Sequence, residues 1–334
     1  MKRIVLLFAL FFCSLGVSHA EPVPVIFDTD IGNDVDDVLA LGMLHSLEAR
    51  GACKLLAVTL TIDAPKAAAF TDAVNTFYGR GGIPIGAVRN GVKSDDGKFL
   101  GLADAMDDGK PRFPHDLKSG ADAPDSVVLL RETLSKQADN SVALVQVGFS
   151  TNLIRLLDSP PDAISPLAGR DLVRSKVKLL SLMAGAFTKI GGDAHYKEYN
   201  VIKDIPAAKK LSEQWPTPMV WSGFEIGIAV PFPAKAAETD FNYVTHHPLK
   251  EALYLYSPPP QERPTWDLTA VLYAVNPDRG YFELSEPGAV VVEPDGFTSF
   301  AAKPDGTQRY LKMNAVQAAR VREALVQLSS QPPR

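Results

Sequence analysis

The sequence predicts an α/β fold, a single domain with an open, mostly parallel sheet and helices on both faces. Short apolar runs typical of buried strands alternate with segments of helical spacing along most of the chain. Polar residues follow several of these runs at their carboxyl ends, where sites form in open α/β sheets. With 334 residues, 46% of them hydrophobic, the chain is long enough to bury one large core.

The first twenty residues have the pattern of a signal peptide. Two basic residues precede the apolar run Ile4–Phe12, and Ser18-His19-Ala20 offers small residues for cleavage. The run is too short to span a membrane, and no later stretch is long enough to do so. We therefore expect cleavage near Ala20, export to a periplasm or secretion, and a mature domain of residues 21–334.

Composition limits the partners. The net charge of −5 gives no electrostatic footprint for nucleic acid or for an anionic membrane surface. After cleavage only Cys53 remains, which excludes an intrachain disulfide. A small molecule is the expected partner.

The stretch from Asp28 to Asp37 carries most of the information about function. Five aspartates fall within ten residues, directly after the apolar run Val23–Phe27, which reads as a buried strand. Apolar residues at helical spacing follow, so a helix should begin at Asp36 or Asp37. Like charges crowded into one loop repel one another unless a cation neutralises them. Carboxylate oxygens without Cys or His favour Ca²⁺ or Mg²⁺ over zinc.

The other elements follow in order. Further short apolar runs predict strands at Leu55–Leu60, Pro84–Val88, Val142–Val147, Val177–Met183, Met219–Trp221, Ala289–Val292 and Ser299–Ala302. Helical spacing, or proline in a first turn, predicts helices at Pro65–Tyr78, Ser126–Gln137, Thr151–Leu157, Ala207–Gln214, Pro248–Tyr256, from Trp266 or Asp267 onward, and at Ala315–Leu328. The long segment Arg89–Pro124 lacks periodicity, which favours a lid or a binding loop.

Several motifs, taken in order, resemble a known family. Asp-Thr-Asp-x-Gly at Asp28–Gly32, followed by Asp36-Asp37 and Ala40-Leu41, is similar to the signature of the calcium-dependent nucleoside hydrolases, the inosine-uridine preferring nucleoside N-ribohydrolases. Later stretches similar to motifs of that family are Val145–Asn152, Leu182–Phe187, Glu198–Asn200 and Trp266-Asp267. The resemblance covers about residues 23–277. It implies a Rossmann-like nucleoside hydrolase fold and hydrolysis of ribonucleosides to free base and ribose.

The resemblance also implies roles for individual residues. Asp30 would be the general base that activates a Ca²⁺-bound water. The implied Ca²⁺ ligands are Asp30, Asp37, Asp267 and the backbone carbonyl of Val147, and Asp28 would fix the loop. Residues implied to contact the substrate are Asp36, Asp63, Glu198, Asn200 and Trp266. Because family members are often dimers or tetramers, a homodimer or homotetramer is the expected assembly.

Three departures from the family pattern bear on these roles. The aspartate loop is two residues longer than the family's commonest form, which leaves the role of Asp34 open. Asp63 stands near the place of an asparagine, and a carboxylate cannot donate a hydrogen bond as an amide does. Trp266 replaces a histidine that protonates the leaving base in some members. Candidate substitutes for that acid are His195, His246 and His247.

Alternative explanations stay open at this point. Asp36, Asp37 or Asp267 could simply cap a helix, Glu198 and Asn200 could be ordinary loop residues, and Trp266 could pack in the core. A phosphatase of the haloacid dehalogenase type also begins with a strand and Asp-x-Asp, although it would not explain the later motifs. A periplasmic protein that binds a ribosyl ligand without turnover is the other alternative. The retained Asp30 favours an enzyme.

Overall fold

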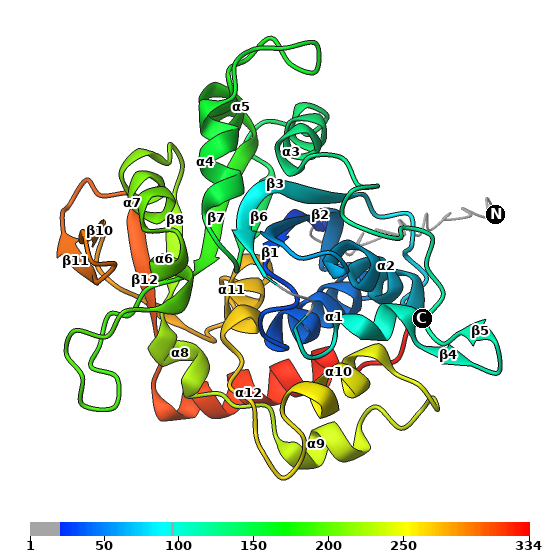
Figure 1. The fold of residues 1–334 in the computed structure, drawn as a ribbon. Helices are drawn as coiled ribbons and strands as arrows, with labels where there is room; N and C mark the ends of the chain where they lie inside the picture. Colours follow the sequence, from blue (N-terminus) through cyan, green and yellow to red (C-terminus); the bar gives the residue numbers. More distant parts are fainter. Residues whose placement is uncertain (1–20, 95–96) are drawn as a thin grey trace, which may run out of the picture.

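The computed structural model describes residues 21–94 and 97–334, so the predicted signal peptide lies outside the described residues. Ten strands form one sheet (Figure 1). They are β1 (Val23–Thr29), β2 (Cys53–Asp63), β3 (Ile85–Lys93), β6 (Val142–Gln146), β7 (Val177–Met183), β8 (Met219–Ser222), β9 (Glu283–Leu284), β10 (Gly288–Val292), β11 (Thr298–Ala302) and β12 (Gln308–Lys312). A separate small hairpin consists of β4 (Met106–Asp107) and β5 (Lys110–Pro111).

The order of the strands is β11-β10-β12-β8-β7-β6-β1-β2-β3, and β9 pairs with β12. All neighbours from β12 to β3 are parallel, whereas β9, β10 and β11 are joined by antiparallel pairs. One continuous sheet therefore runs through the chain, as the alternating pattern predicts, and the predicted fold class is confirmed.

Helices cover both faces of this sheet. They are α1 (Asp36–Ala49), α2 (Ala67–Phe77), the 3₁₀ turn η1 (Leu100–Asp104), α3 (Ser126–Ser135), α4 (Thr151–Asp158), α5 (Gly169–Lys176), α6 (Tyr199–Lys203), α7 (Ile205–Gln214), α8 (Phe224–Ile228), α9 (Ala234–Thr239), α10 (Pro248–Tyr256), α11 (Trp266–Val275) and α12 (Ala315–Ser329). No helix among the described residues is long and apolar enough to cross a membrane.

The alternation of side chains along β1 shows how the two layers form. Val25 and Phe27 point into the core beneath α1, α2, α10, α11 and α12, while Ile26 joins the opposite core beneath α3, α4, α5 and α7. All three side chains are fully buried. A central parallel strand buried on both faces therefore reads as a continuous apolar run. Figure 1 shows α12 packed beside α1 on one side of the sheet.

Most predicted elements match observed ones within a few residues, and the misses have a common cause. Helix α5 has two buried apolar side chains, Leu172 and Val173, which are too few to show helical periodicity in the sequence. Helices α6, α8 and α9 span six residues or fewer and show no periodicity for that reason. The segment 89–124, predicted as one long loop, contains the end of β3, η1 and the β4–β5 hairpin. Short elements held by tertiary contacts leave little trace in a sequence pattern.

Candidate active site and metal centre

The loop after β1 has a conformation set by two of its own residues. The Thr29 hydroxyl donates a hydrogen bond to the Asp37 carboxylate and accepts one from the backbone N–H of Ile31 at 3.1 Å. Gly32 has a φ of 121°, which favours glycine, and the side chain of Leu100 occupies the space where a Cβ would lie. The loop is thereby folded back onto the start of α1.

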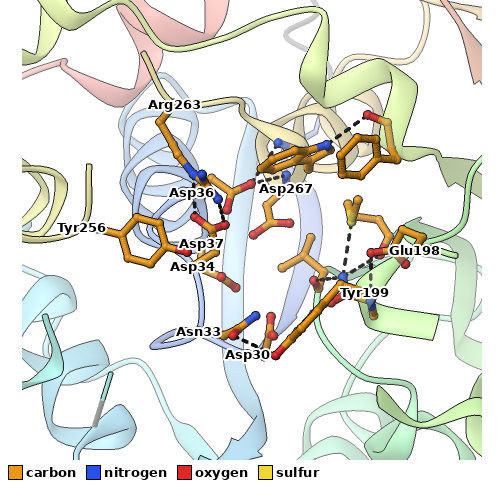
Figure 2. Close-up of a pocket in the computed structure, with 15 residues that line it drawn as sticks. Asp30, Asn33, Asp34, Asp36, Asp37, Glu198, Tyr199, Tyr256, Arg263 and Asp267 are labelled. Atoms are coloured by element: carbon orange, nitrogen blue, oxygen red, sulfur yellow. Dashed lines mark hydrogen bonds and ion pairs between the residues drawn. The ribbon is translucent and has the colours of Figure 1, made fainter. Parts of the chain in front are cut away.

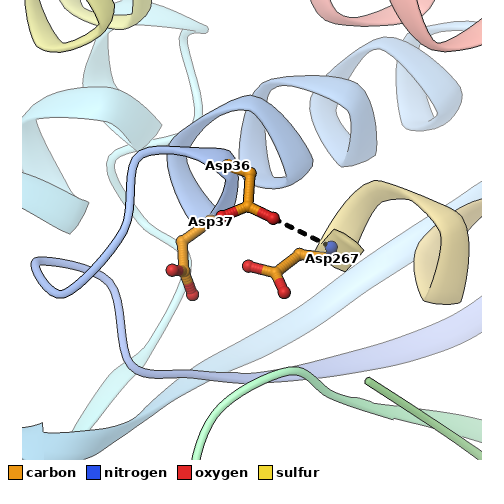
Figure 3. Close-up of side chains that lie close together, drawn as sticks. All are labelled: Asp36, Asp37 and Asp267. Atoms are coloured by element: carbon orange, nitrogen blue, oxygen red, sulfur yellow. Dashed lines mark hydrogen bonds between the residues drawn. The ribbon is translucent and has the colours of Figure 1, made fainter. Parts of the chain in front are cut away.

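Three buried carboxylates meet beside this loop (Figure 3). Asp36 and Asp37 open α1, Asp267 lies in the first turn of α11, and one oxygen atom from each lies within 4.8 Å of the other two. Asp36 does not cap its own helix. Its Oδ2 accepts hydrogen bonds from the backbone N–H groups of Trp266 at 2.9 Å and Asp267 at 3.1 Å. This contact joins the starts of α1 and α11.

The carboxylates line a cavity of about 250 Å³ at the carboxyl edge of the sheet (Figure 2). The lining residues are Asp30, Asn33, Asp34, Asp36, Asp37, Val147, Met183, Glu198, Tyr199, Asn200, Phe224, Tyr256, Arg263, Trp266 and Asp267. All predicted site residues except Asp63 are among them. The tightest acidic group contains Asp36, which was predicted to hold a ribose hydroxyl, whereas Asp30 lies outside that group of three.

Asp63 is the predicted site residue that the structure does not bring to this cavity. The last residue of β1, Thr29, pairs with Leu60 of β2, and β2 continues beside β3 until Asp63 pairs with Lys93. Asp63 therefore lies three residues, about 10 Å, further along the strand than the level at which β1 ends. It lines a separate cavity with Arg89. The predicted ribose contact of Asp63 has no support in the structure.

Burial makes the clustered carboxyl groups difficult to ionise without a cation. Burial, with the charges of two neighbouring carboxylates, raises the pKa of Asp30 to about 8. The pKa values of Asp36, Asp37 and Asp267 are raised well above the ordinary value, first by burial and then by the charges of neighbouring carboxylates, Asp34 among them. The Oδ2 atom of Asp30 is buried and has no hydrogen-bond partner among the described residues. A divalent cation would relieve both conditions.

Asp28 lies behind the cavity, in the layer that joins β1 to its neighbours. Its Oδ1 accepts hydrogen bonds from the Thr59 hydroxyl at 2.6 Å and from Asn152 Nδ2 at 2.9 Å. Asn152 also donates to the Leu60 carbonyl at 2.9 Å, so it links β1, β2 and α4. Burial raises the pKa of Asp28 to about 7 despite these bonds. These bonds tie the end of β1 to β2 and α4 directly before the loop; the predicted role of Asp28 in fixing the loop stays a prediction.

Glu198 and Asn200 organise the opposite wall. The Glu198 carboxylate accepts backbone hydrogen bonds from Gly185 at 3.0 Å and Asn200 at 2.8 Å, so it caps the short helix α6 and ties it to the end of β7. Asn200 Nδ2 donates to the carbonyls of Val147 at 2.7 Å and Met183 at 3.1 Å. The Val147 carbonyl, a predicted metal ligand, thus keeps one lone pair. Burial raises the pKa of Glu198 to about 7.

Trp266 lines the cavity but is anchored in the protein. Its indole N–H donates to the Phe224 carbonyl at 3.0 Å, and the rings of Phe224 and Trp266 lie 5.1 Å apart. The three histidines considered as substitute acids lie elsewhere. His195 is exposed beside Asp295, His246 pairs with Glu251, and His247 is buried against Tyr243. None of the histidines in the described residues lines this cavity.

The structure adds residues that no sequence motif points to. Arg263 forms a two-pronged ion pair with Asp34, with Nε at 3.0 Å from Oδ1 and Nη2 bonded to Oδ2. The partners are 229 positions apart in the chain, and no motif links them. Asp34, which lies in the longer loop, is therefore held in place by an arginine from a distant part of the chain. The exposed Tyr199 bonds through its hydroxyl to Asn33 Oδ1 at 3.2 Å, and Tyr256 completes the lining.

Comparison with known proteins identifies the family. The model of the inosine-uridine preferring nucleoside hydrolase family matches residues 25–322, which is most of the chain. The chain belongs to this family. As a nucleoside hydrolase it is an N-ribohydrolase, an enzyme that cleaves N-glycosidic bonds, and a nucleoside is the small-molecule substrate that fits the family. The haloacid dehalogenase alternative is thereby set aside. No curated protein matches the sequence.

Solved structures share the nucleoside hydrolase fold at low sequence identity. The inosine-uridine preferring nucleoside hydrolase of Bacillus anthracis is 19% identical, with a TM-score of 0.67, over 92% of this chain and 99% of that one. The purine-preferring ribonucleoside hydrolase of Gardnerella vaginalis is 17% identical, with a TM-score of 0.66, over 92% and 99%. The type III effector XopQ, solved with adenosine diphosphate ribose, is 17% identical, with a TM-score of 0.62, over 94% and 95%. These likenesses concern the fold.

Proposed function

We propose that this nucleoside hydrolase cleaves ribonucleosides to free base and ribose, with Asp30 as general base and Ca²⁺ as the metal. The observation that carries the proposal is the position of Asp30. It lines the cavity close enough to Asp37 and Asp267 for its charge to raise their pKa values, and its Oδ2 is buried without a partner. A carboxylate so placed is available to accept a proton.

The donor set fits a hard cation. The residues that would hold Ca²⁺ are Asp30, Asp37, Asp267 and the carbonyl of Val147, all oxygen donors on the cavity wall. The raised pKa values of these aspartates and the buried Asp30 oxygen without a hydrogen-bond partner both fit a site that takes a positive charge. Ca²⁺ bound there would polarise a water molecule and hold sugar hydroxyl groups.

The residues of the chain then share the work of the reaction. The oxygen of a water molecule attacks the anomeric carbon as the C–N bond breaks, through an oxocarbenium-like transition state. Asp30 takes the proton of that water; beside a divalent cation its carboxyl group is ionised at neutral pH, as a base must be. Asn200 uses its N–H groups on backbone carbonyls, which leaves Oδ1 to accept a hydrogen bond from a sugar hydroxyl. Asp36 and Glu198 are further acceptors on the wall.

The first test is calcium-dependent release of ribose. Purified mature protein would be incubated with inosine, uridine, adenosine and cytidine, with Ca²⁺ and then with chelator, while reducing sugar is measured. We expect release that chelation abolishes and Ca²⁺ restores. Bound calcium without release from any nucleoside would contradict the proposal and favour a protein that captures a ribosyl ligand without turnover.

We also propose export and self-assembly. The sequence pattern of residues 1–20 supports removal of a signal peptide near Ala20 and a periplasmic or secreted enzyme. The mass of the mature protein tests this, because an N-terminus that retains Met1 would contradict it. The family resemblance supports a homodimer or homotetramer, and light scattering of the mature protein would test that assembly.

A further inference from the structure

We propose that Arg263 is a catalytic residue that stabilises the departing base, and that Asp34 is the residue that positions it. The inference deepens the proposed function and rests on it. It starts from an unusual neighbour in an acidic cavity: six lining residues are acidic, and Arg263 is the one basic side chain among the described residues that line it.

Arg263 is held rigidly in the cavity wall. Its guanidinium group is fixed along one edge by the two-pronged pair with Asp34. The same group lies over the rings of Tyr256 and Trp266, 4.9 Å and 5.2 Å from their centroids. Because the pair and the two rings fix both the edge and the plane of the guanidinium group, its remaining donors point in set directions.

Donors remain for a ligand. A guanidinium group has five N–H bonds, of which Asp34 takes one from Nε and one from Nη2. Nη1 has no acceptor among the described residues, although the side chain of Arg263 lines the cavity. A guanidinium group does not lose its proton at physiological pH, so Arg263 acts as a fixed positive charge with free hydrogen-bond donors.

The position of Arg263 suits the base and not the sugar. In Figure 2, Arg263 and Tyr256 lie on one side of the acidic cluster, and Glu198 and Tyr199 lie on the other. Glu198 and Asn200 make their end of the cavity polar, as a sugar requires. The end with Arg263 is lined by the rings of Tyr256 and Trp266, which suit a planar base. A riboside held this way presents its leaving nitrogen toward Arg263.

The chemistry of the bond gives this cation a task. When the C–N bond breaks, its electron pair goes to the ring nitrogen, and a neutral base departs as an anion unless it is protonated. No histidine in the described part of the chain lines the cavity to supply that proton. Arg263 would donate hydrogen bonds to the base as negative charge develops, and the anion would take its proton from solvent after release. Preorganised donors of this kind stabilise a transition state strongly.

The role of Asp34 explains the longer loop. Asp34 follows Asn33 in that loop and is largely buried, as Arg263 is, with side-chain exposures of 19% and 24%. Its Oδ1 also accepts the backbone N–H of Val35 at 2.6 Å, directly before α1. The arginine is thereby tied to the start of the helix that carries Asp37, one of the proposed metal ligands. The longer loop thus sets the distance between the charge that meets the base and the groups that meet the sugar.

The test compares two ribosides that differ in how much help the leaving group needs. The leaving group of inosine is poor, whereas 4-nitrophenyl riboside releases a stable phenolate that departs without stabilisation by the enzyme. For Arg263→Met we expect kcat/KM to fall about 100-fold with inosine and only several-fold with 4-nitrophenyl riboside. Arg263→Lys keeps the positive charge but loses the two-pronged pair with Asp34, so its kcat/KM with inosine should lie between the values of the wild type and Arg263→Met. Asp34→Asn should show the same selectivity with a smaller loss.

Controls separate the possible failures. Arg112 also forms ion pairs with two carboxylates, those of Asp107 and Glu251, but it does not line the cavity. Arg112→Met should therefore keep the wild-type activity on both ribosides. Calcium titration calorimetry of each variant shows whether the metal site is intact. Equal losses of kcat/KM on both ribosides with Arg263→Met would overturn the role of Arg263 in leaving-group departure. Failure of the wild type to cleave either riboside would instead overturn the proposed function.

Discussion

Replacing Asp30 with Asn should stabilise the calcium-free protein while it abolishes turnover. Burial raises the pKa of Asp30 from 3.8 to about 8, so the folded, metal-free chain holds this carboxyl group protonated at pH 7. The unfolded chain holds it ionised. Keeping a proton on a group of ordinary pKa at pH 7 costs about 4 kcal/mol, at about 1.36 kcal/mol for each pH unit. Asparagine is neutral and of the same shape, so it avoids that cost.

The sign of the pH dependence follows from the same shift. Between pH 4 and pH 8 the folded state binds more protons at Asp30 than the unfolded state, so stability falls as pH rises through this window. The advantage of Asp30→Asn should therefore be absent near pH 4 and approach about 4 kcal/mol at pH 7. Saturating Ca²⁺ should narrow the gap, because the wild type gains binding free energy that the variant loses.

The measurement is urea unfolding of both proteins in chelator at several pH values. Asp305→Asn, an exposed aspartate between β11 and β12, is the matched control and should leave the free energy of unfolding unchanged. If Asp30→Asn in chelator at pH 7 were no more stable than the wild type, the account of Asp30 as a strained, buried carboxyl group would be wrong. Substantial ribose release by the variant with Ca²⁺ would remove Asp30 from the role of base.

Three further predictions concern other residues in and around the sheet edge. Asp267→Asn should weaken calcium binding at least about 10-fold by calorimetry, because it removes one charge from the buried cluster; unchanged affinity would place the ion elsewhere. Asp63→Asn should leave kcat/KM for inosine unchanged, since Asp63 lines another cavity, and a clear loss would restore its predicted substrate contact. Gly148→Ala should lower the free energy of unfolding by about 1–3 kcal/mol and reduce activity, because a Cβ there would lie 2.6 Å from the backbone nitrogen of Asp30. If Gly148→Ala kept the wild-type free energy of unfolding and the wild-type activity, the prediction would be wrong, and the backbone around this position would be able to shift and make room for the Cβ.

Patterns in the sequence were enough to predict the strand and helix that frame the site. The run before Asp28 is apolar at every position because β1 is a central strand buried on both faces, and α1 begins at Asp36 as its apolar spacing indicates. The clustering of aspartates in that loop also predicted a site at the carboxyl edge. These features depend on contiguous residues, whose periodicity and turn chemistry act over a few positions.

Only the tertiary structure decided which polar residues share the cavity. In the sequence, Asp63 follows an apolar run just as Asp30 does, but β2 and β3 continue together past the end of β1 and carry Asp63 away. Arg263 meets Asp34 only because α11 starts beside the start of α1, where Asp36 binds the first N–H groups of α11. The sequence by itself thus determined the layered fold and the acidic loop, through local patterns. Strand lengths, register and contacts between distant segments decided the rest, because they depend on how the whole chain packs.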